Sequence, residues 1–158
     1  MRKRSRYRPK GVRLDVMGWV KEGMAPITTH QQAVLNLRIK NHAALTSITR
    51  GTGTRHDIDI LVAAINMTEA LAMNGLGTDW RAEITAAQTA ILTMAQRGLA
   101  KGNRFLFTGP ELNAVNLAME IHDAQIDKAS VADLEKALAK VRAEIKAGRA
   151  RVIERATI

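Results

Sequence analysis

Apolar residues recur at intervals of three and four positions in five successive stretches of this 158-residue chain. That interval brings side chains onto one face of an α-helix, because a helix completes a turn every ~3.6 residues. A β-strand needs strict alternation instead, and only the short run 104–108 approaches it. The pattern therefore predicts an all-α fold, a single bundle of five to six helices, and the length suits one domain.

Aromatic residues make up only 3% of the chain, although 46% of it is hydrophobic, so small and unbranched side chains must fill the core. Such side chains suit closely packed helices. The chain contains no cysteine, which excludes disulfides, thiolate metal sites and cysteine catalysis.

Capping residues and glycines set the boundaries of the first two predicted helices. One opens at Thr29, with Gln32 at the capping-box position three residues on, and stops near Gly51. The next opens at Thr54 and ends at Gly75. Their predicted buried faces hold Val34, Leu37, Leu45, Ile48, Ile58, Leu61, Val62, Ile65 and Leu71.

A third helix is predicted to begin near Thr78 or Asp79, to bury Ile84, Ile91 and Met94, and to close at Gly98 or Gly102. The apolar run 105–107 follows it. We expect this run to plug one end of the bundle, the alternative being a binding site for a partner.

The last two helices have the clearest starts. Thr108, Pro110 and Glu111 combine a capping residue, a first-turn proline and a capping-box acid. The final helix opens at Ser130 and ends at Gly148. Their predicted buried stripes hold Leu112, Val115, Met119, Ile126, Leu134, Leu138, Val141 and Ile145.

These two helices invite an alternative interpretation as a DNA-reading helix-turn-helix. The final helix would then offer Lys136, Lys140 and Arg142 to a groove. The linking segment 128–130 lacks the usual glycine, however, and a bundle hairpin explains the same spacing.

The first thirteen residues carry seven positive charges and no negative one, within a chain of net charge +9. We expect residues 1–13 to form a flexible basic arm and residues 14–158 to form the helical domain, with Trp19 in a strap that packs on the body. Arginine and lysine neutralise phosphates, and Tyr7 is placed to stack on a base. The predicted nucleic-acid-binding residues are Arg2, Lys3, Arg4, Arg6, Tyr7, Arg8, Lys10 and Arg13.

A weaker basic group lies near the other end of the chain. A second basic surface is predicted from Arg142, Lys146, Arg149 and Arg151. The arm and this group would form one larger electropositive surface if the fold brought them together. The alternatives for the arm are an acidic patch on a protein partner, or a solvated tail that aids solubility.

No motif specifies a reaction or a cofactor. Glu120 and His122 are two residues apart, whereas a helical metal site needs a spacing of three, so we expect His122 to make surface hydrogen bonds or a cap. The run 51–54 lacks the lysine of a phosphate-binding loop. We therefore predict no catalytic residue, no metal site, no cofactor and no enzymatic activity.

The longest apolar run, 60–65, is far shorter than the ~18 residues of a membrane span. The basic N-terminus has no apolar segment behind it, which argues against a signal peptide. We expect a protein of the host-cell cytoplasm with no membrane partner.

Five short runs together resemble a group of small bacteriophage and prophage proteins, some of which are labelled Fis-type transcriptional regulators. The runs are 3–10, 22–26, 39–42, 54–59 and 119–125. The resemblance covers nearly the whole chain and implies a phage setting, and the label implies regulation.

The predicted function is that of a small phage nucleic-acid-binding or regulatory protein that acts without catalysis. One alternative is an interaction module that binds a host complex, such as a polymerase, a nuclease or a defence system. Another is a virion or packaging component. The stripe of the final helix is too short to predict a coiled-coil dimer, so the oligomeric state stays open.

Overall fold

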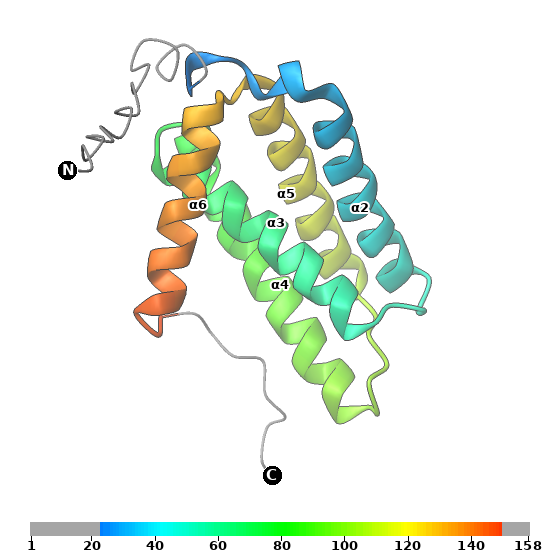
Figure 1. Cartoon of the computed structure of the whole chain (residues 1–158). Coiled ribbons are helices and arrows are strands. Elements are labelled where there is room, and N and C mark those ends of the chain that lie inside the picture. The colour runs from blue at the N-terminus through cyan, green and yellow to red at the C-terminus, as the bar shows by residue number, and fades with distance from the viewer. Residues whose placement is uncertain (1–22, 150–158) are drawn as a thin grey trace, which may run out of the picture.

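A computed structural model describes residues 23–149 of the chain as a helical bundle (Figure 1). Across these residues it contains five α-helices and no strand, which confirms the predicted all-α class. The helices are α2 (Gln31–Thr49), α3 (Arg55–Met73), α4 (Arg81–Ala100), α5 (Gly109–Lys128) and α6 (Val131–Lys146), with 3₁₀ turns η1 (Ile27–His30) and η2 (Thr78–Trp80). No helix of the described part has both the length and the apolarity that crossing a membrane requires.

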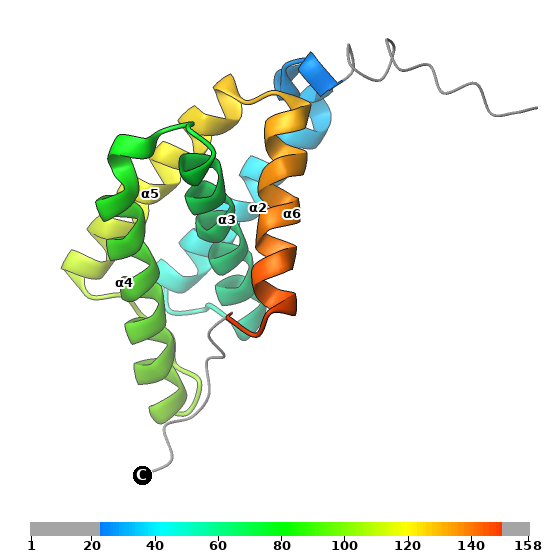
Figure 2. The ribbon, with the colours of Figure 1, turned by 90° about the vertical axis from the view of Figure 1, so that its left-hand side faces the viewer.

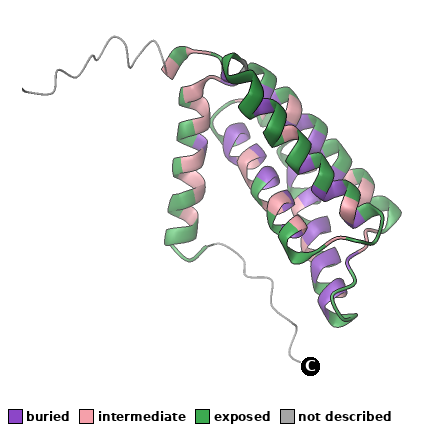
Figure 3. Cartoon of the chain, turned by 45° about the vertical axis from the view of Figure 1, so that its right-hand side comes forward, coloured by how far each residue is buried: buried purple, intermediate pink, exposed green. Residues whose placement is uncertain are grey.

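Helix α3 is the centre of the bundle, because it packs against α2, α4, α5 and α6. The main core lies among α2, α3, α4 and α5, and most of its residues are Ile, Leu and Ala, with Met94 and Met119 filling the centre. A smaller cluster joins Ile27, Leu71, Ile126 and Ala137 near the junction of α5 and α6. Figure 3 shows the buried positions as stripes along the helix faces that point inward.

Three of the helix starts form capping boxes as the sequence predicts. At α3, the Thr54 N–H donates to Asp57 Oδ2 at 2.7 Å, and the Asp57 N–H donates to Thr54 Oγ1. Thr108 caps α5 and Ser130 caps α6 in the same manner. Each box satisfies backbone donors of the first turn that would otherwise lack partners.

The capping box predicted at Thr29 is wrong. The Thr29 N–H and hydroxyl both donate to the Pro26 carbonyl, at 3.0 and 2.7 Å, and so build the turn η1. Gln32 donates instead to Asn36 Oδ1 at 2.9 Å, and α2 begins at Gln31. Leu37, predicted to be buried, is 37% exposed.

Of the two glycines predicted to close α4, the structure confirms Gly102 and not Gly98, since α4 continues to Ala100 and Gly102 follows it with a φ of 70°. Gly98 is an interior residue of α4, and glycine is needed there because the Phe105 ring packs against its backbone and leaves no room for a side chain. Phe105 is 2% exposed, so it plugs this end of the bundle as predicted. The segment 104–108 is an extended loop and not a strand.

The described chain begins in a short antiparallel contact with the α5–α6 junction. The Ile27 N–H donates to the Ala129 carbonyl at 3.0 Å, and the Val131 N–H donates to the Ala25 carbonyl at 2.9 Å. Ile27 is buried by this pairing. The predicted position of Trp19 in the strap lies outside the described residues.

The apolar stripe of α6 is less buried than the sequence predicts. Ala137 is the only fully buried residue of α6, Leu134 and Val141 are half-buried, and Ile145 is 60% exposed. The reason is that α6 packs mainly along α3, with α4 on the far side of α3 (Figure 2). Helices α5 and α6 do not pack along each other, so they form neither the predicted bundle hairpin nor the crossed pair of a helix-turn-helix.

Candidate functional site

The structure describes most of the predicted second basic surface and none of the predicted basic arm. The nucleic-acid-binding residues predicted in the range 1–13 lie outside the described residues, as does Arg151. Arg142 and Lys146 lie on the exposed surface of α6, and Arg149 follows its end.

Arg149 is held by an acidic side chain in the last turn of α6. Its Nε donates to Glu144 Oε2 at 2.6 Å and its Nη2 donates to Glu144 Oε1 at 2.9 Å. The hydrogen bond from Arg149 lowers the pKa of Glu144 below its ordinary value. Among the described residues, no acidic side chain is paired in this way with Arg142 or Lys146, so these two cations remain open to solvent.

The points where the two basic segments join the body lie at opposite ends of α6 (Figure 1). Gly23 lies beside the start of that helix, where an added Cβ would be 3.7 Å from the Cβ of Ala132. Arg149 lies just beyond its other end. A helix of 16 residues spans roughly 24 Å. The body therefore does not bring the two attachment points together.

The surplus positive charge is concentrated outside the body of the protein. Residues 23–149 contain 14 Lys and Arg against 12 Asp and Glu, which leaves +2 of the total +9. The remaining +7 belongs to the two ends of the chain. The body is therefore nearly neutral in comparison with its termini.

A buried polar cluster lies between α2, α3 and α5, with His122 at its centre. The His122 ring is 1% exposed, its Nδ1 is 2.9 Å from Thr68 Oγ1, and its Nε2 is 3.4 Å from Asn41 Nδ2. Because the Thr68 hydroxyl donates to the Ala64 carbonyl, it accepts from the ring, which assigns the proton of neutral His122 to Nδ1. Asn41 can then donate to Nε2.

The same cluster is closed by Gln125, whose amide donates to the carbonyls of Thr68 at 3.0 Å and Leu76 at 2.7 Å. Burial lowers the pKa of His122 to about 4, so the ring is neutral at pH 7. A neutral, internally bonded ring cross-links three helices and has no access to solvent. The cluster is therefore structural.

The expectation that His122 is a surface or capping residue is wrong. The sequence does contain the signal that places it inside, since Val115, Met119, His122 and Ile126 follow one another at spacings of four, three and four. Because His122 is polar, a prediction from hydrophobic spacing leaves it out of the buried face, although its position belongs to that face.

Charged pairs join α2 to α5 above this cluster. Arg38 Nη2 donates to the Asp123 carbonyl at 3.0 Å and to Asp127 Oδ1 at 2.5 Å. His42 Nε2 lies 2.7 Å from Asp123 Oδ2. Within residues 23–149, no three His, Asp or Glu side chains gather closely enough to hold a metal ion.

A groove of about 610 Å³ runs between α4 and α6, with α3 as its floor, and it was not predicted. Its apolar lining includes Val62, Met73, Leu92, Val141 and Ile145. On its α3–α4 side, Gln88 Nε2 donates to Glu69 Oε2 at 2.8 Å and to Asn66 Oδ1 at 3.3 Å. The exposed end of the apolar stripe of α6, at Val141 and Ile145, thus forms one wall of a groove with both polar and apolar lining residues.

These observations define a class, an all-α bundle protein with a nearly neutral body and a strongly basic N-terminal segment. No protein-family model, curated protein or solved structure matches the chain. The functional argument therefore rests on the chemistry of its own residues.

Proposed function

We propose that this chain is a small phage-type nucleic-acid-binding or regulatory protein that acts in the host cytoplasm without catalysis. Its basic arm contacts phosphates largely without regard to sequence. Arg2, Lys3, Arg4, Arg6 and Arg8 carry most of that binding, and Tyr7, Lys10 and Arg13 add to it.

The distribution of charge is the observation that supports this proposal. Thirteen residues with seven cations and no acid precede a body that carries only +2. Within the described body, by contrast, cations such as Arg38 and Arg97 are paired with acidic side chains. A cation-rich segment gains free energy from a polyanion, since each neutralised phosphate releases condensed counterions.

The test is the salt dependence of binding to a 20-base-pair duplex, a single-stranded DNA and an RNA, measured by fluorescence anisotropy. For duplex DNA, log K falls with log salt by ~0.9 for each phosphate contact, so full engagement of the arm gives a slope near −6. Replacing the seven arm cations by glutamine is expected to remove most of that slope.

A deletion of residues 1–13 provides an independent control for the glutamine variant. Absence of binding at low salt would contradict the proposal, and so would an affinity that is unchanged by the deletion. Thermal unfolding of each variant checks that the body is intact.

A second candidate is a protein-interaction module that binds a host complex. The α4–α6 groove favours it, because Met73 is 45% exposed and Ile145 is 60% exposed at its rim. A pull-down from host lysate with nuclease treatment distinguishes the two candidates. A stoichiometric, nuclease-resistant partner that Ile145→Asp releases would favour this second function over the first.

A further inference from the structure

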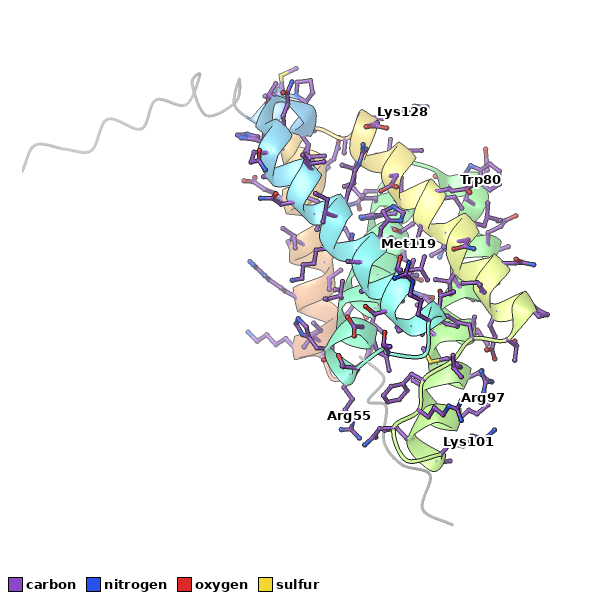
Figure 4. All side chains as sticks on the ribbon, turned by 90° about the vertical axis from the view of Figure 1, so that its right-hand side faces the viewer. Arg55, Trp80, Arg97, Lys101, Met119 and Lys128 are labelled. Atoms are coloured by element: carbon purple, nitrogen blue, oxygen red, sulfur yellow. The ribbon has the colours of Figure 1, made fainter. Side chains whose placement is uncertain are left out.

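Two loops meet at the end of the bundle that lies farthest from residue 23. The loop after α2 and the loop after α4 touch, because Leu106 Cδ2 is 3.3 Å from the place of a Cβ on Gly51. Figure 4 shows Arg55, Arg97 and Lys101 at this end, and Lys128 and Trp80 at the other. Residues far apart in the sequence thus share one surface.

Four exposed cations belong to these loops and to the helix ends beside them: Arg50, Arg55, Lys101 and Arg104. No ion pair among the described residues involves any of them. The segments that carry them are free of acid, since neither 23–56 nor 101–110 contains Asp or Glu.

The acidic residues nearest in sequence are mostly engaged elsewhere. Asp57 Oδ2 accepts from the backbone and the hydroxyl of Thr54 in the α3 cap. Glu111 is clamped by Arg97, whose Nη1 and Nη2 donate to it at 2.8 and 2.6 Å. Only Asp59 is exposed with no bonded partner among the described residues. This end of the body therefore presents more open positive charge than negative.

Helix stability explains two of the four cations and leaves two unexplained. Arg50 and Lys101 occupy the C-cap positions of α2 and α4, where a positive charge suits the helix dipole. Arg55 is the first residue of α3, where the helix dipole disfavours a cation. Arg104 lies in a loop and contacts no acid within the described range.

We propose that Arg50, Arg55, Lys101 and Arg104 form a second phosphate-contacting surface, which binds the backbone of the nucleic acid that the arm engages. This inference rests on the proposed function and adds the body to it. The 19-residue α2 separates this surface from the arm's attachment by roughly 28 Å. One nucleic acid lying along α2 would meet both, and no acid of η1 or α2 would repel it.

The test compares two variants of the full chain that lose the same charge. One carries Arg50→Gln, Arg55→Gln, Lys101→Gln and Arg104→Gln. The other carries Arg81→Gln, Lys128→Gln, Lys136→Gln and Lys140→Gln, which lie outside this surface and outside the predicted second basic surface. With the 20-base-pair duplex, the first variant is expected to lose between about 2 and 4 from the slope of log K against log salt. The control variant is expected to keep the parental slope.

A double variant, Arg55→Gln with Arg104→Gln, guards against misfolding because it leaves both helix C-caps intact. It is expected to lose about 2 from the slope with an unchanged melting temperature. A parental slope in the quadruple and double variants would overturn the inference, while the arm variant would still test the proposed function. Equal losses in the two quadruple variants would also overturn it, since net charge alone would then explain them. A parent protein that binds nothing would overturn both proposals.

Discussion

Gly98 is the position where the packing of this bundle makes the sharpest prediction. It lies inside α4, and a Cβ added to it would be 2.2 Å from Phe105 Cδ1, 2.7 Å from Phe105 Cε1 and 3.1 Å from the Arg104 carbonyl. In an open helix, Gly→Ala stabilises by ~0.5–1 kcal/mol, because alanine loses less backbone entropy on folding. Here the added methyl group overlaps a ring that is 2% exposed.

The two effects oppose each other, and their magnitudes decide the sign. Forcing an extra methyl group into a packed core costs ~1–3 kcal/mol. After the gain in helix propensity is subtracted, we expect Gly98→Ala to reduce the free energy of unfolding by roughly 0.5–2 kcal/mol. Urea titration at pH 7 measures this change. Ala139→Gly is the control, because Ala139 is an exposed interior residue of α6 and this change measures the difference in helix propensity alone.

A double-mutant cycle attributes the loss to the ring. In a Phe105→Leu background the clash is smaller, so adding Gly98→Ala is expected to cost close to nothing or to stabilise. The reasoning is refuted if Gly98→Ala is as stable as the parent, or if its cost is the same in both backgrounds.

Three further predictions concern groups whose burial or pairing the structure defines. The pKa of His122 is about 4 in the folded state and 6.5 in the unfolded state, so the unfolded imidazole is protonated first as the pH falls. The free energy of unfolding therefore decreases between about pH 6.5 and 4, by up to ~3 kcal/mol. His122→Leu should flatten that part of the pH profile of unfolding, and an unchanged profile would contradict the assignment. Hydrogen bonding to Arg97 lowers the pKa of Glu111 to about 2, so its contribution is present above pH 4.5 and is lost as the pH falls toward 2. Glu111→Gln should cost ~1–2 kcal/mol at pH 7 and weaken the acid dependence in that range, which chemical unfolding at each pH would detect. Ile145→Ala should change stability by less than ~0.5 kcal/mol, against ~2–5 for the fully buried Ile126→Ala, and comparable losses would mean that α6 is covered in solution.

Capping boxes were predictable wherever they depend on a single turn. The boxes at Thr54, Thr108 and Ser130 need only residues three positions apart, and all three form. The box at Thr29 fails because Ile27 pairs with Ala129, about a hundred positions along the chain, and this pairing fixes the turn before α2. A local pattern cannot anticipate a contact of that range.

The candidate site divides in a similar way. The charge of the arm follows from composition, and the exposure of Arg142 and Lys146 agrees with their place beside an apolar stripe. The surface that Arg50 and Arg104 share could not be predicted, since it requires that the loops after α2 and α4 touch. The groove beside α6 likewise depends on α6 packing on α3 and leaving α4 free.

The sequence by itself determined the all-α class, the approximate extent of each helix and the excess of positive charge at the ends, because helical periodicity, capping and charge are properties of neighbouring residues. Tertiary structure alone decided that His122 is a neutral core residue and that Ile145 stays open to solvent. It also decided which cations of the body have acidic partners, since Arg38 meets Asp127 and Arg97 meets Glu111 only after distant helices have packed. Burial and ion pairing depend on distances between elements, and the order of residues along a chain does not specify those distances.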